Sequence, residues 1–109
     1  MRANNVHHKR YKKTLAFVNQ HIDKGSLILD MGIHNPMAEL MQSQGYKVEN
    51  TGGEDLDEDQ TTLINSKAEV VTAFEILEHL LSPYQVLKSI KAKKLVVSVP
   101  LKLWFSKTY

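Results

Sequence analysis

Three short apolar segments constrain the fold of this chain more than any other feature. They lie at residues 27–29 (LIL), 69–74 (EVVTAF) and 94–99 (KLVVSV), and their apolar residues stand side by side instead of alternating with polar ones. A strand with one solvated face alternates, whereas a strand covered on both faces does not. The segments therefore predict an α/β fold, in which a mainly parallel sheet lies between two layers of helices.

Helical patterns separate these segments. A helix over residues 6–23 is predicted by apolar side chains spaced four, three and four residues apart: Tyr11, Leu15, Val18 and Ile22. Asn35-Pro36 and Ser82-Pro83 each join an N-cap residue to a proline suited to the first helical position. They open predicted helices that run to residue 44 and to about residue 92. A further strand is expected over 46–51 and a short helix over 59–66, with Leu56 in an edge strand or a loop.

The end of the chain carries no further predicted strand. Residues 101–109 are apolar and aromatic, and they follow Pro100, which ends the segment at 94–99. We therefore expect 94–99 to be an unpaired sheet edge, which favours aggregation or a homodimer. Three aromatic side chains are available to cover it in place of a second copy: Trp104, Phe105 and Tyr109.

Composition excludes several classes of protein. The chain has 109 residues, which indicates one domain, and no cysteine, so disulfides, zinc thiolates and cysteine nucleophiles are ruled out. The net charge of +2 is too small to indicate a nucleic-acid partner, and the basic side chains of residues 1–13 are expected to be solvated. No apolar run reaches the roughly 18–20 residues of a membrane span, and no signal-peptide core follows the basic start. We expect a cytoplasmic protein.

Metal binding is not expected either. His7-His8 lies in a surface helix with no third ligand nearby, and the acidic stretch 54–59 lacks the spacing and the glycine of a calcium loop. In a parallel sheet, ligands bind at the carboxyl ends of the strands, where the strand order reverses. Those ends are predicted at residues 30–35, 51–57, 74–79 and 99–101.

Two segments resemble class I S-adenosylmethionine (SAM) dependent methyltransferases. Residues 68–100 are similar to the family's fourth and fifth strand regions, where an apolar run precedes E-x-L-E-H and a proline-capped helix; the matching residues are Glu75, Leu77, Glu78, His79 and Pro83. LILDMG (27–32) resembles the first strand and the start of the glycine-rich turn. The resemblance implies a Rossmann-like three-layer sandwich that binds SAM and methylates a small molecule.

The resemblance also implies roles for individual residues. Asp30 and Gly32 would hold the amino acid end of SAM, Leu56 and Asp57 would lie near adenine, and Phe74 would line the cleft. Glu75 and His79 are the candidate catalytic residues, Glu75 lining the cleft and His79 facing the acceptor. A carboxylate can bind an ammonium group, a glycine lets the backbone approach a ligand, and a neutral imidazole can accept a proton.

The chain departs from the family in two places. The family turn reads D-x-G-x-G-x-G, whereas here His34 and Pro36 replace two glycines, and the His34 ring is expected to enter the cofactor space. The family's last two strands, an antiparallel hairpin, have no counterpart. We therefore expect a truncated domain, with weak SAM binding and little turnover if the chain is complete.

Other interpretations stay open from the residues alone. Asp30 and Gly32 also suit a plain strand-to-helix turn, and His79 suits a histidine that is satisfied by backbone groups. Glu75 and Glu78 are either an acid–base pair, or one faces the cleft while the other is solvated. A different class of function is a non-catalytic, methyltransferase-like interaction module. A nicotinamide-dependent oxidoreductase ranks lower, since no G-x-G-x-x-G turn is present.

Overall fold

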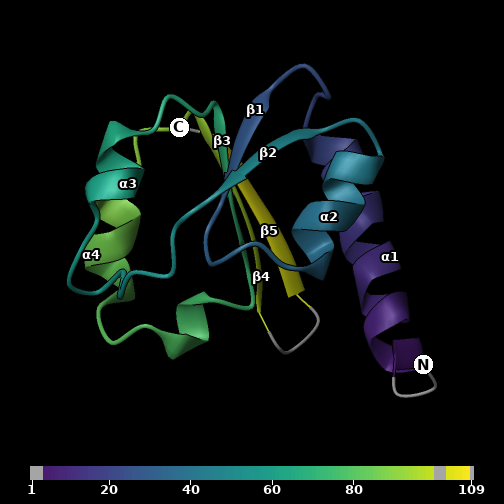
Figure 1. The fold of residues 1–109 in the computed structure, drawn as a ribbon, viewed down its shortest axis with the longest axis horizontal. Helices are drawn as coiled ribbons and strands as arrows, with labels where there is room; N and C mark the ends of the chain where they lie inside the picture. Colours follow the sequence, from purple (N-terminus) through teal and green to yellow (C-terminus); the bar gives the residue numbers. More distant parts are fainter. Residues whose placement is uncertain (1–3, 100–102, 109) are drawn as a thin grey trace.

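A five-stranded sheet lies between two pairs of helices (Figure 1). The structure, a computed structural model, describes residues 4–99 and 103–108. The elements along the chain are α1 (Asn4–His21), β1 (Leu27–Asp30), α2 (Pro36–Ser43), β2 (Lys47–Asn50), α3 (Thr61–Asn65), β3 (Val70–Phe74), the 3₁₀ turn η1 (Leu77–His79), α4 (Pro83–Lys88), β4 (Lys94–Val99) and β5 (Leu103–Thr108).

The strand order is β2-β1-β3-β4-β5, and the first four strands are parallel. Ile28 of β1 pairs with Val48 of β2 on one side and with Val70 of β3 on the other. The chain moves from β1 outward to β2 and then returns to the other side of β1, so the strand order reverses between β1 and β3. These pairings confirm the predicted α/β, Rossmann-like fold with a mainly parallel sheet.

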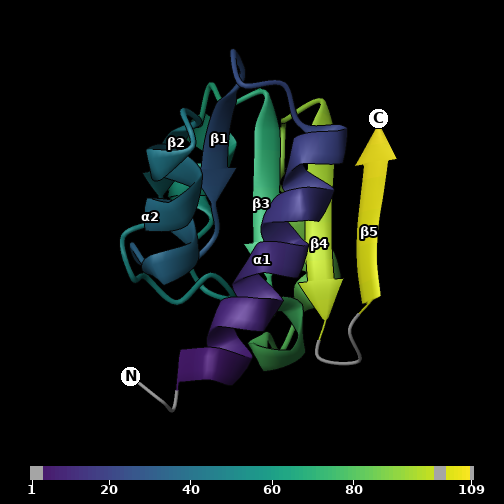
Figure 2. The ribbon, with the colours of Figure 1, turned by 90° about the vertical axis from the view of Figure 1, so that its right-hand side faces the viewer.

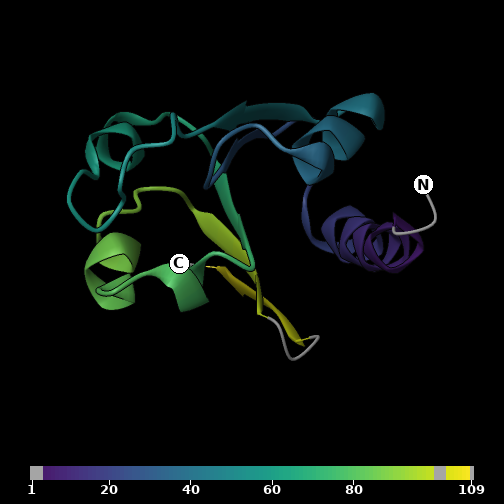
Figure 3. The same cartoon turned by 60° about the horizontal axis from the view of Figure 1, so that its bottom comes forward.

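Each face of the sheet has its own core, as Figures 1 and 3 show from two directions. Successive strand residues point to opposite faces, so neighbours along a strand belong to different cores. The core beneath α1 and α2 is built on Val18, Ile22, Ile28, Met37, Met41, Tyr46, Val70 and Val96. The core beneath α3 and α4 is built on Leu29, Met31, Leu56, Leu63, Ala68, Val71, Ala73, Val86, Leu95 and Val97.

Helices α2 and α4 begin at the prolines where the sequence predicts, whereas α1 and α3 are shifted by about two residues from the predicted starts, and α4 ends early. Asn35 Oδ1 accepts a hydrogen bond from Ala38 N at 2.9 Å, which caps α2 as expected. Helix α4 starts at Pro83 but stops at Lys88, four residues short of the predicted end. The reason is local, because Ser89 N and Ile90 N bond to carbonyl groups three residues back and so close the last turn. None of the helices in the described part of the chain is both long and apolar enough to cross a membrane.

The prediction that β4 forms an unpaired edge is wrong. β5 pairs with it in the antiparallel direction along its whole length, from Lys94 opposite Thr108 to Val99 opposite Leu103 (Figure 2). The backbone of β5 therefore satisfies the hydrogen-bonding groups of β4 that were expected to be exposed. The homodimer expected through β4 would need an unpaired strand edge there, and β4 has none because β5 occupies it. The side chains of Trp104, Phe105 and Tyr109 lie outside the described part of the structure.

Candidate functional site

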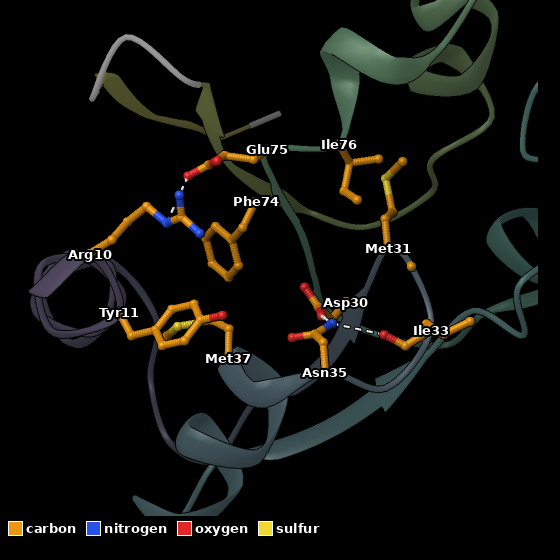
Figure 4. Close-up of a pocket in the computed structure, with 11 residues that line it drawn as sticks. Arg10, Tyr11, Asp30, Met31, Ile33, Asn35, Met37, Phe74, Glu75 and Ile76 are labelled. Atoms are coloured by element: carbon orange, nitrogen blue, oxygen red, sulfur yellow. Dashed lines mark hydrogen bonds and ion pairs between the residues drawn. The ribbon is translucent and has the colours of Figure 1, made fainter. Parts of the chain in front are cut away.

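A cavity of about 280 Å³ opens at the carboxyl ends of β1 and β3, where the strand order reverses (Figure 4). Its walls come from three parts of the chain: α1, the turn after β1, and the segment that follows β3. Tyr11, Met37 and Phe74 contribute apolar surface, and Arg10 and Glu75 lie together on one side. This is the position at which open α/β sheets bind their ligands.

Gly32 forms the turn at the end of β1. Its φ of +111° lies in the region that side chains disfavour, and its N–H donates to Thr51 Oγ1 at 2.8 Å. A Cβ atom at this position would lie 3.5 Å from Ile76 Cδ1, in ordinary contact. The backbone conformation, more than the available space, therefore requires glycine at this wall of the cavity.

Asp30 is the buried centre of a hydrogen-bond network that joins three strands. Its side chain is 2% exposed, and Thr72 Oγ1 of β3 donates to its Oδ1 at 2.7 Å. Its Oδ2 accepts from Asn35 Nδ2 in the turn and from Asn50 Nδ2 of β2, both at 3.0 Å. Burial raises the pKa of Asp30 above its ordinary value, while these hydrogen bonds oppose the rise. The carboxyl group thus orients the turn, and its role toward a ligand stays a prediction.

Glu75 directly follows β3 and has a backbone conformation that is rare for its type. Its φ is +58°, and among the described residues it is the only non-glycine residue with a positive φ. Its Oε2 lies 3.2 Å from Nε of Arg10 on α1 (Figure 4). Such conformations cost free energy and concentrate at functional sites.

Arg10 lines the cavity, which sequence reasoning missed because Arg10 was grouped with the solvated basic residues at the start of the chain. It contacts Glu75 at the cavity wall instead. One signal was available: Arg10 directly precedes Tyr11, the first residue of the apolar stripe, so it lies at the border of the buried face.

Two of the predicted adenine-binding residues lie elsewhere. Leu56 is buried in the core beneath α3 and α4 and belongs to no strand. Asp57 accepts hydrogen bonds from the backbone N–H groups of Leu81 at 2.9 Å and Ser82 at 2.8 Å, so it fixes the entry to α4. Neither residue lines the cavity.

His79 does not line the cavity either. It is the last residue of η1, its side chain is 75% exposed, and its Nε2 lies 3.7 Å from Glu78 Oε2. His34 is also absent from the cavity lining, and the expectation that its ring enters the cofactor space stays a prediction. Its Nδ1 lies 3.3 Å from Asn50 Oδ1, and its Nε2 lies 3.9 Å from Glu39 Oε2.

The structure therefore brings together four of the seven predicted site residues: Asp30, Gly32, Phe74 and Glu75. Leu56, Asp57 and His79 lie outside this group. Comparison with known proteins adds no assignment, since no protein-family model, curated protein or solved structure matches the chain. Function must be argued from the cavity itself.

Proposed function

We propose that this chain is a SAM-dependent methyltransferase domain that acts on a small molecule. One observation carries the proposal: the cavity lies at the reversal of strand order, and its wall is the Gly32 turn at the end of β1. The resemblance of residues 27–32 and 68–100 to class I methyltransferases supports the same position for SAM.

The charges at the cavity favour SAM over a dinucleotide. Two carboxyl groups, those of Asp30 and Glu75, line it together with one guanidinium group, that of Arg10. A pyrophosphate would approach two acidic groups and would be repelled when they are ionised. SAM instead carries a sulfonium cation and an ammonium group, which an acidic surrounding attracts. A nicotinamide-dependent oxidoreductase is therefore less compatible with this site.

The cavity residues fit one end of SAM. A volume of about 280 Å³ lies just below the roughly 300–1,000 Å³ of sites for drug-sized ligands, so the adenosine part extends beyond it. Gly32 presents bare backbone to the ligand, while Phe74 and Met37 provide apolar contact. SAM, when bound, would supply a methyl group that the acceptor attacks at carbon, and the electron pair of the broken C–S bond would leave on the thioether sulfur. Such a displacement depends chiefly on alignment, which rigid strand ends can provide.

Two side chains are proposed to act on the molecules bound at the site. Glu75 faces the cavity, and its carboxylate is placed to orient an acceptor or ligand group by hydrogen bonds. His79 is exposed and lies three residues after Ile76, the last residue that lines the cavity, and its imidazole can receive the proton that the acceptor loses. Replacing His79 by Gln is expected to lower turnover without changing SAM affinity.

Isothermal titration of the full chain with SAM and with S-adenosylhomocysteine tests the proposal. We expect saturable binding of both compounds at one site. Absence of heat at millimolar ligand would contradict it.

A second candidate, the non-catalytic interaction module, is favoured by a different observation. Leu81 and Tyr84 are 91% and 70% exposed beside η1, which is unusual for large apolar side chains. Sedimentation of the chain and of Leu81→Ser tests this candidate. This candidate would be favoured if the parent chain sediments as a stable dimer with or without SAM, and if Leu81→Ser sediments as a monomer.

A further inference from the structure

We infer that Arg10 and Glu75 form a two-charge clamp that binds the zwitterionic amino acid end of SAM, with Arg10 on the α-carboxylate and Glu75 on the α-ammonium group. The inference rests on the proposed function and adds to it a specific binding role for α1. It also assigns a ligand contact to a residue far from the segments that resemble the methyltransferase family.

The first argument is position. Arg10 and Glu75 come from α1 and from the residue after β3, and both line the cavity on the same side (Figure 4). Asp30, the acidic residue expected to bind the ammonium group, already accepts hydrogen bonds from three side chains and is 2% exposed. Glu75 is 29% exposed at its side chain, so it is the carboxylate that a ligand can reach.

The second argument is charge. An α-amino acid end carries one positive and one negative group and is neutral overall. A guanidinium group pairs with a carboxylate through a planar pair of hydrogen bonds, and a carboxylate accepts from an ammonium group. A neutral zwitterion that inserts beside Arg10 and Glu75 therefore gives each charge an opposite partner and adds no net charge to the cavity.

The third argument is that stability does not explain the pair. The side chains of Arg10 and Glu75 are 39% and 29% exposed, and ion pairs with such exposure add little to folding. The φ of +58° at Glu75 costs free energy in addition. A backbone conformation that costs stability and aims a carboxylate at a cavity is typical of a ligand contact.

The test uses two ligands that differ only in the amino acid end. S-adenosylhomocysteine carries it, whereas 5′-methylthioadenosine keeps the adenosine and the thioether but lacks it. Titration calorimetry of the full chain is expected to give about 10- to 100-fold tighter binding of S-adenosylhomocysteine. Arg10→Gln and Glu75→Gln are each expected to remove about tenfold or more of that advantage and to leave 5′-methylthioadenosine binding unchanged.

Lys12→Gln is the matched control, because it removes the same charge from an exposed position on the same helix. Arg10→Lys keeps the charge without the planar donors and is expected to lose part of the affinity. Melting temperatures close to that of the parent chain show that each variant is folded.

The outcomes separate the two proposals. If both ligands bind equally well, or if Arg10→Gln weakens both alike, the clamp is wrong while the proposed function stands. If the folded parent chain binds neither adenosyl compound, the proposed function fails and the clamp fails with it.

Discussion

At the scale of single residues, two carboxyl groups at the cavity show how burial decides what an acid can do. Asp30 is enclosed by Thr72, Asn35 and Asn50, so its oxygens are committed to holding β1, β2 and β3 together. Glu75, at the end of the neighbouring strand, keeps an accessible side chain and pairs with the guanidinium group of Arg10 on α1. The sequence could identify both acids but could not show this division of roles.

The raised pKa of Asp30 predicts a pH dependence of stability. Because the native state binds the proton more tightly than the unfolded state, this group contributes stability that is fully present below its ordinary pKa of 3.8 and is lost as pH rises through the native value. The unfolding free energy of the parent chain minus that of Asp30→Asn should therefore fall as pH rises from about 4. Urea unfolding at several pH values measures it.

Glu58→Gln serves as the control for that measurement, since it neutralises an exposed carboxyl group of the same chain. Its difference from the parent chain is measured at the same pH values, so that the effect of burial at Asp30 is separated from the effect of removing a charge. A difference for Asp30→Asn that also stays constant, or that grows with pH, would show that the burial of Asp30 does not oppose its ionisation.

The positive φ of Glu75 predicts an unusual response to glycine. Glycine adopts a positive φ readily, so Glu75→Gly removes a conformational cost of roughly 1–2 kcal/mol and thereby stabilises the folded chain. Loss of the weak ion pair and the greater chain entropy of glycine in the unfolded state act in the opposite direction. Glu75→Gly is therefore expected to leave the unfolding free energy unchanged or to raise it by up to about 1 kcal/mol. Glu49→Gly, at an exposed position of β2, should instead cost about 0.5–1 kcal/mol. Equal losses in the two variants would contradict the assignment of strain to Glu75.

At the scale of secondary structure, local signals predicted the elements that are covered on both faces and missed β5, the strand at one edge of the sheet. Apolar runs marked β1, β3 and β4, and the Asn35-Pro36 pair marked the start of α2. β5 was missed because the aromatic residues after Pro100 suggested a covering tail, and the pairing that makes them a strand comes from β4. The two strands are neighbours in the sequence, since Val99 pairs with Leu103, and β5 was missed also because Pro100 was taken as the end of the sheet.

Asp57 makes a contact between two parts of the chain that the family resemblance did not predict. It was assigned to adenine, but its carboxylate accepts two backbone hydrogen bonds at the entry to α4. Asp57→Ala should lower the unfolding free energy by about 1–2 kcal/mol, because both N–H groups lose their acceptor. Glu58→Ala, one residue along, should change it by less than about 0.5 kcal/mol. Chemical denaturation compares the two, and equal effects would contradict the capping role.

At the scale of the whole molecule, the sheet order brings together residues that lie far apart in the sequence. Buried strands and their connecting helices were enough to predict the three layers and the end of the strands at which the cavity lies. The composition of the cavity wall was not predictable in the same way. Arg10 reaches Glu75 because α1 packs against the sheet through residues such as Val18, which places Arg10 beside the residue that follows β3.

The central claim is that SAM binds at the carboxyl ends of β1 and β3. A titration of the ¹⁵N-labelled chain with S-adenosylhomocysteine, followed by amide NMR, tests it most directly. The account predicts the largest shifts at Gly32, Ile33, Glu75 and Ile76. Little change is expected at Lys93 and Lys94, which lie at the amino end of β4 and so at the opposite end of the parallel strands. Shifts centred on Lys93 and Lys94, or no shifts at millimolar ligand, would contradict it.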